Sequence, residues 1–253
     1  MGEGKLSGAR ELARVIDHTL LRPDAREAEI LRLPDEAAQY GFAAVCVAPR
    51  WAARVRGRLE ELGVGGEVRL AVVVGFPHGT TTSAAKAFEA AEAVRAGADE
   101  LDMVVSLGDL KDLRMERVRA DIAAVVEAAA GRPVKVILET ALLTAEERAR
   151  AVEAAALAGA TYVKTGTGFP PGKPATEEDV RELAALAHSY GLRVKASGGI
   201  RDVRTARRLL AAGADRLGTS SGVAIVKEAE EEERRRGSDG LEQGVETEEP
   251  TEG

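Results

Sequence analysis

Short apolar runs alternate with longer amphipathic stretches along most of the chain. Regular alternation of this kind is typical of strands and helices that build a parallel sheet covered by helices. We predict eight strands, near residues 14–18, 43–47, 68–75, 100–105, 134–139, 161–165, 193–197 and 216–219. We predict amphipathic helices between them, near 24–39, 50–62, 80–96, 115–130, 144–158, 176–190 and 202–212, with a short helix before the first strand and another after the last.

One phrase recurs where a predicted helix gives way to a predicted strand. The segments "RAGADELDMVV" (95–105), "LAGATYVKTG" (157–166) and "AAGADRLGTSS" (211–221) share Ala-Gly-Ala followed by a short apolar run. Glycine at this place ends a helix, because it adopts a positive φ without penalty. Threonine or aspartate stands near several predicted helix starts, as in "LLTAEE", "PATEED" and "GIRDVRTA", where it can cap free amides.

Eight such units in about 220 residues fit a closed (β/α)8 TIM barrel, an α/β fold, with a short N-terminal helix. A doubly wound open sheet is the alternative, but no Gly-x-Gly-x-x-Gly follows the first predicted strand. We expect residues 1–236 to form a single barrel domain, whose last helix runs to about Arg236. Residues 237–253 are poor in apolar side chains, so we expect a disordered acidic tail there.

Charge is distributed unevenly over the 253 residues. The formal net charge is −7, and residues 227–253 account for all of it, with 11 acidic against 4 basic side chains. The neutral remainder gives no reason to expect a nucleic-acid partner. We find no apolar run of roughly 18 residues and no signal-peptide core. The single cysteine excludes an intrachain disulfide, and we expect a cytoplasmic protein without a membrane partner.

Polar side chains interrupt most of the predicted strands. In barrels of this kind the catalytic groups lie at the carboxyl ends of the strands and in the loops that follow. We therefore expect one mouth of the barrel to gather Asp17, His18, Cys46, Asp102, Glu139, Lys164, Lys195 and Thr219 to Ser221. Asp99 and Glu100 flank the start of the fourth strand, and we expect them to be solvated.

Two of these residues are lysines on adjacent predicted strands, Lys164 in "YVKTGTGF" and Lys195 in "RVKASGGI". A buried, unpaired ammonium is costly, so a single lysine would most simply be paired with a carboxylate. Two neighbouring lysines in an apolar pocket favour another interpretation, in which one loses its proton near neutral pH and becomes a nucleophile for carbonyl groups. The pair predicts a Schiff-base enzyme, and the pattern alone does not say which lysine reacts.

Asp102 lies inside the fourth predicted strand, between Leu101 and Met103, so we expect its carboxylate to point inward. It can serve as the counter-ion of a lysine, as a proton shuttle to a substrate hydroxyl or water, or as both. Glycine-rich turns, "GTGF", "ASGGI" and "GTSSGVAI", follow the last three predicted strands. Exposed amides in such turns bind anions, and barrels commonly bind phosphate after their late strands. We therefore expect a phosphorylated substrate.

The remaining candidates carry weaker signals. His18, His78 and His188 have no short metal-binding spacing, so a metal-assisted hydrolase is an alternative that we do not favour. Cys46 is flanked by Val45 and Val47, as expected of a small core residue.

Six segments carry a family resemblance: "VIDHTLLRPDA", "ELDMVVSLGDLK", "VKVILET", "YVKTGTGF", "VKASGGIR" and "GTSSGVAIV". From about Val15 to Val226 the chain resembles the deoxyribose-phosphate aldolases, with these motifs in the family's order. The resemblance implies a class I carbon–carbon lyase of deoxynucleoside breakdown. Such an enzyme reversibly cleaves 2-deoxy-D-ribose 5-phosphate to D-glyceraldehyde 3-phosphate and acetaldehyde through a lysine Schiff base, with no metal or organic cofactor.

Carried over by motif, the resemblance makes Lys164 the Schiff-base lysine, Lys195 the cation that keeps Lys164 deprotonated, and Asp102 the proton shuttle. The residues implied to line the phosphate and sugar site are Thr167, Gly168, Gly198, Gly199, Gly218, Ser220 and Ser221.

The chain departs from the family pattern in three places. Gly166 stands where the usual "KTSTGF" has serine, and we expect it to loosen the turn without removing a catalytic group. Ser106 stands where asparagine is frequent. Some members bring a C-terminal tyrosine to the active site, but the last tyrosine here is Tyr190. We therefore expect proton transfer to rely on Asp102, Lys195 and water.

Two alternative functions remain open at this point. One is another barrel lyase or isomerase of phosphorylated aldehydes, in which the lysines act only as charges. The other is a non-catalytic barrel that binds sugar phosphates. In either case we expect the partners to be small sugar phosphates and aldehydes, and the assembly to be a homodimer.

Overall fold

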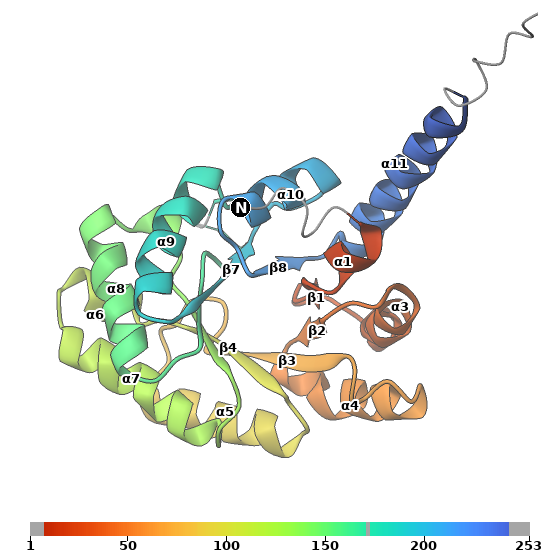
Figure 1. The fold of residues 1–253 in the computed structure, drawn as a ribbon. Helices are drawn as coiled ribbons and strands as arrows, with labels where there is room; N and C mark the ends of the chain where they lie inside the picture. The colour runs from red at the N-terminus through yellow and green to blue at the C-terminus, as the bar shows by residue number, and fades with distance from the viewer. Residues whose placement is uncertain (1–7, 171–172, 243–253) are drawn as a thin grey trace, which may run out of the picture.

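A closed barrel of eight parallel strands forms the centre of the molecule (Figure 1). The computed structural model describes residues 8–170 and 173–242, with side chains to residue 236. Each strand pairs with the next in chain order, and the eighth pairs with the first. The strands are β1 (Ile16–Leu20), β2 (Ala44–Val47), β3 (Arg69–Val74), β4 (Glu100–Val104), β5 (Val134–Ile137), β6 (Tyr162–Lys164), β7 (Arg193–Ser197) and β8 (Arg216–Thr219). The predicted (β/α)8 fold is confirmed.

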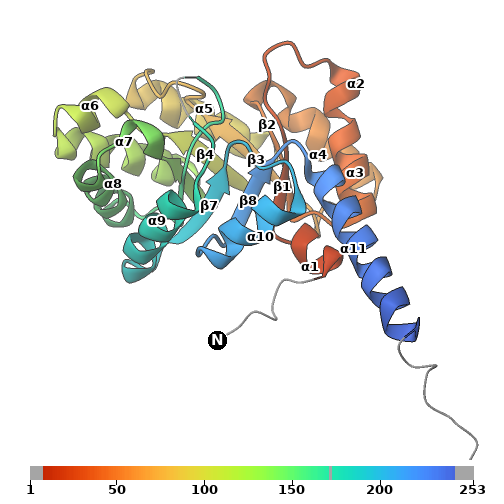
Figure 2. The same cartoon turned by 90° about the horizontal axis from the view of Figure 1, so that it is seen from above.

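Helices cover the outside of the barrel (Figures 1 and 2). The longer ones are α3 (Arg32–Tyr40), α4 (Ala52–Glu61), α5 (Ser83–Arg95), α7 (Met115–Ala128), α8 (Ala145–Leu157), α9 (Glu177–Ser189), α10 (Val203–Ala211) and α11 (Gly222–Glu242). The shorter ones are α1 (Ala9–Ala13), α2 (Glu27–Ile30), α6 (Leu107–Lys111) and the 3-10 helices η1 (Pro49–Trp51) and η2 (Thr140–Leu142). Within the described part of the chain, every helix is too short or too polar to cross a membrane.

Local sequence signals set the helix ends. The hydroxyl of Thr144 accepts a hydrogen bond from the amide of Glu147, whose carboxylate accepts one from the amide of Thr144, so that α8 begins with a capping box. Asp202 caps α10 in a similar way through its side chain. After α10, Gly213 adopts a φ of 113°, and a Cβ atom there would lie 2.6 Å from that of Ala184. The helix-glycine-strand phrase therefore works as predicted.

Most of the apolar core lies between the barrel and its helices. The outward side chains of β4, Leu101 and Met103, belong to this layer. Inside the barrel, a small apolar cluster contains Cys46, Ala71 and Val73. Buried charges occupy much of the remaining interior, as described below.

Some boundaries differ from the prediction. The helix predicted at 24–39 is divided into α2 and α3, and Pro34 lies in the first turn of α3, where its missing amide costs least. The first strand begins and ends two residues later than predicted. Helix α6 was not predicted, because five residues are too few to show a helical period. Helix α11 passes its predicted end at Arg236 and continues to Glu242. Residues 243–253, on which much of the predicted tail falls, lie outside the described residues.

Candidate active site

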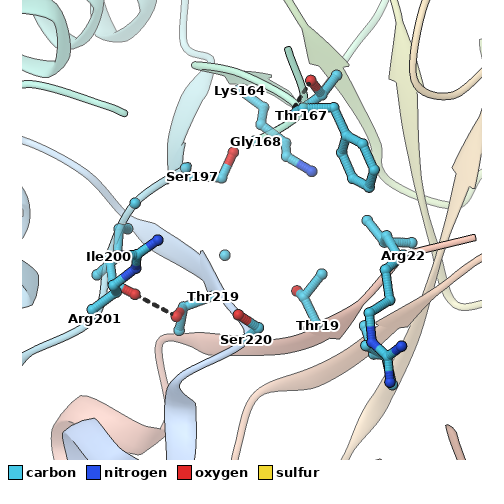
Figure 3. A pocket seen from close by; sticks show the side chains of 16 residues that line it. Thr19, Arg22, Lys164, Thr167, Gly168, Ser197, Ile200, Arg201, Thr219 and Ser220 are labelled. Atoms are coloured by element: carbon cyan, nitrogen blue, oxygen red, sulfur yellow. Dashed lines mark hydrogen bonds between the residues drawn. The ribbon is translucent and has the colours of Figure 1, made fainter. Parts of the chain in front are cut away.

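Lys164 is the last residue of β6, at the carboxyl end of the barrel. Its side chain is 3% exposed and points into a cavity of about 280 Å³ (Figure 3). Its Nζ donates a hydrogen bond to Oδ2 of Asp102 at 2.9 Å. This lysine is therefore buried and paired, yet it borders an open cavity that other predicted site residues also line.

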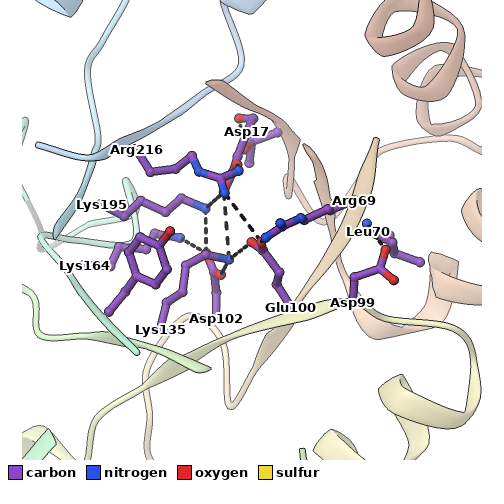
Figure 4. A network of polar contacts seen from close by, with 12 residues as sticks. Asp17, Arg69, Leu70, Asp99, Glu100, Asp102, Lys135, Lys164, Lys195 and Arg216 are labelled. Atoms are coloured by element: carbon purple, nitrogen blue, oxygen red, sulfur yellow. Dashed lines mark hydrogen bonds and ion pairs between the residues drawn. The ribbon is translucent and has the colours of Figure 1, made fainter. Parts of the chain in front are cut away.

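Asp102, on β4, joins three lysines (Figure 4). Its carboxylate accepts hydrogen bonds from Lys135 at 2.8 Å, Lys164 at 2.9 Å and Lys195 at 2.8 Å. Lys164 and Lys195 share the oxygen Oδ2 and lie opposite each other in the β6–β7 register. Burial opposes the ionised carboxylate, but the three ammonium groups outweigh burial and hold the pKa of Asp102 well below its usual range.

Lys195, on β7, remains a cation in this environment. Burial opposes its charge, but the carboxylates of Asp102 and Asp17 favour it more strongly and raise its pKa. Asp17, on β1, is likewise buried, and Lys195 and Arg216 overcome that burial and lower its pKa to about 2. The sequence predicted an inward Asp17 but did not connect it to Lys195.

Lys135, on β5, was not predicted. It is fully buried, and its ammonium contacts Asp102 at 2.8 Å and Glu100 at 2.5 Å. Burial opposes its charge, while Asp102 and other carboxylates raise its pKa. A signal was available, because a Val-Lys pair occurs at Lys135 just as it does at Lys164 and Lys195.

The prediction that Glu100 is solvated is wrong. Glu100 is fully buried and contacts Lys135 at 2.5 Å and Arg216 at 3.5 Å. Its burial opposes ionisation, but Lys135 helps to lower its pKa. The physical reason is the strand period: Glu100 lies two residues before Asp102, so both side chains point into the barrel. Asp99 points the other way, toward Arg56.

These buried ionic residues form one unit, which we call the charge cluster. Its members are Asp17, Glu100, Asp102, Lys135, Lys164, Lys195 and Arg216. Three carboxylates thus face four buried cations, and Glu100 also contacts the half-exposed Arg69 at 2.7 Å. Among the described residues, Lys164 has one carboxylate partner, while each of the other cations in the cluster has at least two.

The cavity beside Lys164 contains most of the predicted phosphate and sugar residues. Those that line it are Thr167, Gly168, Gly198, Gly199, Gly218 and Ser220. Ser221 does not line it, and its amide donates to Oγ1 of Thr219 at 2.8 Å. The structure adds two cations that the sequence did not single out, Arg22 and Arg201 (Figure 3). Arg201 could have been found, because it directly follows "SGGI".

The histidines do not converge on this cavity. Nε2 of His18 lies 2.6 Å from Glu36 of α3, and burial lowers the pKa of His18. His188 pairs with Asp215 at 3.0 Å on the outside of the barrel. In the described part of the chain, no three His, Cys, Asp or Glu side chains are grouped so as to hold a metal ion. Cys46 is buried as predicted, and burial raises the pKa of its thiol.

Comparison with known proteins identifies the family of this chain. The model of the DeoC/LacD family of aldolases matches residues 12–228. The deoxyribose-phosphate aldolase of Geobacillus sp. (strain WCH70) is 50% identical over 219 residues, covering 85% of this chain and 95% of that protein. That of Streptococcus sanguinis (strain SK36) is 49% identical over 219 residues, covering 86% and 96%. The tetrameric deoxyribose phosphate aldolase of Aeropyrum pernix, a solved structure, is 39% identical and has a TM-score of 0.82, covering 88% of this chain and 92% of that one. The chain belongs to the DeoC/LacD family of aldolases.

Proposed function

We propose that this aldolase reversibly cleaves 2-deoxy-D-ribose 5-phosphate into D-glyceraldehyde 3-phosphate and acetaldehyde through a Schiff base on Lys164. The observation that carries the proposal is the position of the Lys164 amine, between the charge cluster and a cavity with glycine turns and two arginines. The relatives named deoxyribose-phosphate aldolase support the choice of substrate.

A Schiff base requires a neutral amine. Loss of one proton would make the charge cluster neutral, because four cations face three carboxylates. Lys164 contacts a single carboxylate of the charge cluster, so a neutral Lys164 removes fewer ion pairs than neutralising any other cation of the cluster would. It is also the cluster member that borders the cavity. We therefore assign the nucleophile to Lys164, and Lys195 to the neighbouring positive charge that disfavours a second ammonium.

The reaction follows from this placement. The amine of Lys164 attacks C1 of the open-chain sugar, and the adduct loses water to give a protonated imine. A base removes the proton of the C3 hydroxyl, and the electrons of the C2–C3 bond move into the iminium to leave an enamine. C3 becomes the aldehyde carbon of glyceraldehyde 3-phosphate. Protonation of the enamine at C2 and hydrolysis of the imine then release acetaldehyde and the free lysine.

Asp102 is the group we assign to proton transfer, together with Lys195 and water. Its carboxylate lies within hydrogen-bond distance of the nitrogen that gains and loses protons during the reaction. Because the neighbouring ammonium groups of Lys135 and Lys195 stabilise its anion, a proton on Asp102 is held briefly and passed on. Replacing Asp102 by a smaller side chain should therefore slow the proton-transfer steps, and it should also break the ion pairs that Asp102 makes.

The phosphate is assigned to the cavity wall opposite Lys164. Backbone amides in the turns at Gly198, Gly199 and Gly218, and the hydroxyl of Ser220, are donors suited to phosphate oxygens. Arg201 adds a positive charge, and an arginine can bind a phosphate through two parallel hydrogen bonds. We retain Ser221 as a contributor through its hydroxyl, since its amide is engaged by Thr219.

Borohydride trapping tests the central step. Wild-type protein and Lys164→Ala are incubated with acetaldehyde and reduced, and peptides are examined by mass spectrometry. We expect an added ethyl group on the wild-type peptide that contains Lys164 and none in the variant. An unmodified wild-type chain would contradict the Schiff-base mechanism.

A second assay tests the substrate and the absence of a metal requirement. Release of glyceraldehyde 3-phosphate from 2-deoxyribose 5-phosphate is compared with cleavage of other phosphorylated sugars, with and without a chelator. We expect preference for 2-deoxyribose 5-phosphate and no effect of the chelator. Preference for another phosphorylated sugar would overturn the substrate while leaving the lysine chemistry intact.

We further propose that residues 1–236 form the catalytic domain and that the protein is a cytoplasmic homodimer. The family match over residues 12–228 supports the domain limits. The single cysteine supports a reducing compartment. Light scattering after gel filtration tests the assembly, and a mass other than twice that of the chain would exclude the dimer.

A further inference from the structure

Glu139 is a buried carboxylate that the mechanism above does not use. It follows β5, is 4% exposed and adopts a φ of 56°, in the left-handed region that side-chain-bearing residues rarely occupy. The residues on both sides of Glu139 form backbone hydrogen bonds with the segment that contains Lys164, the proposed nucleophile. The amide of Leu138 donates to the carbonyl of Lys164 at 2.9 Å, and the amide of Thr140 donates to the carbonyl of Thr165 at 2.8 Å.

The carboxylate of Glu139 holds Thr167. Its Oε2 accepts hydrogen bonds from the amide of Thr167 at 3.1 Å and from the hydroxyl of Thr167 at 2.7 Å. The hydroxyl oxygen of Thr167 in turn accepts from the amide of Phe169 at 3.1 Å. Both donors of Thr167 are thus engaged within the protein. Thr167 can still accept a hydrogen bond from a sugar hydroxyl, but it has no donor left for a phosphate oxygen.

Gly166 provides the space that this carboxylate occupies. A Cβ atom at Gly166 would lie 2.5 Å from Oε1 of Glu139. Gly166 does not have a positive φ, so its backbone conformation does not require glycine. On the other side of the segment, the hydroxyl of Ser197 donates to the carbonyl of Gly166 at 2.5 Å. Besides the expected loosening of the turn, glycine at this position leaves room for the carboxylate of Glu139.

We propose that Glu139 is a positioning residue for the reaction and that it acts as one unit with Gly166. The carboxylate lies over Gly166 and fixes residues 166–169, which carry Thr167, Gly168 and Phe169 on the cavity wall, relative to Lys164. The inference rests on the proposed function, because the sugar chain attached to Lys164 is what this wall would contact.

Replacement of Glu139 gives the first test. In Glu139→Ala the two hydrogen bonds to Thr167 are lost, and we expect the KM for 2-deoxyribose 5-phosphate to rise on the order of tenfold while kcat changes by less than about threefold. Glu139→Gln keeps an acceptor oxygen and should recover most of the loss. Glu153→Gln, at an exposed position of α8, is the matched control and should retain the wild-type KM. A wild-type KM in Glu139→Ala overturns the inference.

Coupling between the two positions gives the second test. Gly166→Ala should raise the KM by a similar factor, because the added methyl group displaces the carboxylate. In the Glu139→Ala background the same change should have no further effect. Gly57→Ala is the control, since nothing lies within 4 Å of a Cβ atom at that position. If Gly166→Ala and Glu139→Ala raise the KM independently, so that their factors multiply in the double variant, Glu139 and Gly166 do not act as one unit.

Trapping of acetaldehyde separates this inference from the proposed function. If the wild type neither cleaves the sugar phosphate nor traps acetaldehyde on Lys164, the proposed function fails. If the wild type does both and the Glu139 and Gly166 variants match its KM, the positioning role alone fails. If Glu139→Ala does not fold, the comparison of Gly166→Ala with Gly57→Ala decides the question, and equal KM values refute it.

Discussion

Replacing Asp102 by asparagine would remove the one anion that three buried lysines share. Asparagine has nearly the same shape, so the change isolates the loss of charge from the loss of packing. Lys135, Lys164 and Lys195 are each at most 3% exposed and would be left with fewer counter-ions. Lys164 would have no carboxylate partner among those the structure describes.

The cost of this change can be worked out from known buried ion pairs. Removing one partner of such a pair costs about 3–5 kcal/mol, because the remaining charge stays buried. Lys135 and Lys195 keep carboxylate partners in Glu100 and Asp17, so we expect the cost of roughly one broken buried pair, about 4 kcal/mol near pH 7. For a domain of this size that corresponds to a fall in melting temperature of roughly 10 °C.

Thermal unfolding at two pH values is the appropriate assay. In the wild type the lowered pKa of Asp102 stabilises the fold above the unfolded value of 3.8, and this contribution is lost as the pH falls below that value. Asparagine has no group that ionises, so the difference in melting temperature between the wild type and Asp102→Asn should be large near pH 7 and should shrink toward pH 3.

Two results would refute this reasoning. One is a variant that melts within about 2 °C of the wild type near pH 7. The other is a variant with the same dependence of melting temperature on pH as the wild type. Asp24→Asn is the control, since its side chain is 76% exposed and the change should leave the melting temperature close to that of the wild type.

Three further changes give distinct outcomes. Arg201→Ala should raise the KM for 2-deoxyribose 5-phosphate roughly tenfold or more but leave cleavage of unphosphorylated 2-deoxyribose unchanged. Equal effects on the two substrates would exclude a contact between Arg201 and the phosphate. Truncation after Arg236 should keep turnover within about twofold of that of the full chain, because the shortened chain retains Glu233, through which α11 contacts Ala9. A loss of turnover would show that the tail enters the site. Lys86→Met should lower the free energy of unfolding, measured in denaturant, by about 3–5 kcal/mol, because it leaves Asp121 buried without its partner at 2.6 Å. Trapping of acetaldehyde on Lys164 should persist, and an unchanged free energy of unfolding would contradict a stabilising role of this ion pair.

The order of strands and helices could be predicted because the fold repeats one local unit. The glycines at 97, 159 and 213 all adopt a positive φ after a helix, as the Ala-Gly-Ala phrase indicated. Short elements such as α6 could not be predicted, because their few residues show no period. The end of α11 was placed at Arg236 because the residues that follow are poor in apolar side chains, whereas the helix continues to Glu242.

The sequence predicted inward polar side chains that precede a glycine turn, and it missed others deeper in the barrel. Lys164 and Lys195 precede glycine turns, and this made them conspicuous. Strands buried on both faces lack the alternation of polar and apolar residues that separates inward from outward positions. Lys135 was therefore missed, and Glu100 was grouped with Asp99 although the period of two assigns it to the face of Asp102. Pairing between strands distant in sequence, such as Lys195 with Asp17, has no local signal at all.

The arrangement of charges also explains why one lysine of three can be the nucleophile. Cations and carboxylates alternate along the barrel interior (Figure 4). Lys164 contacts Asp102, which also contacts Lys195 and Lys135. Lys195 contacts Asp17, Lys135 contacts Glu100, and both of these carboxylates contact Arg216. A cation in the middle of this series has carboxylates on both sides, so its proton is held by at least two ion pairs. Lys164 ends the series at the cavity and has a carboxylate on one side only. The reactivity that we assign to Lys164 thus follows from its place at the end of an alternating series, a property that no single strand of the sequence contains.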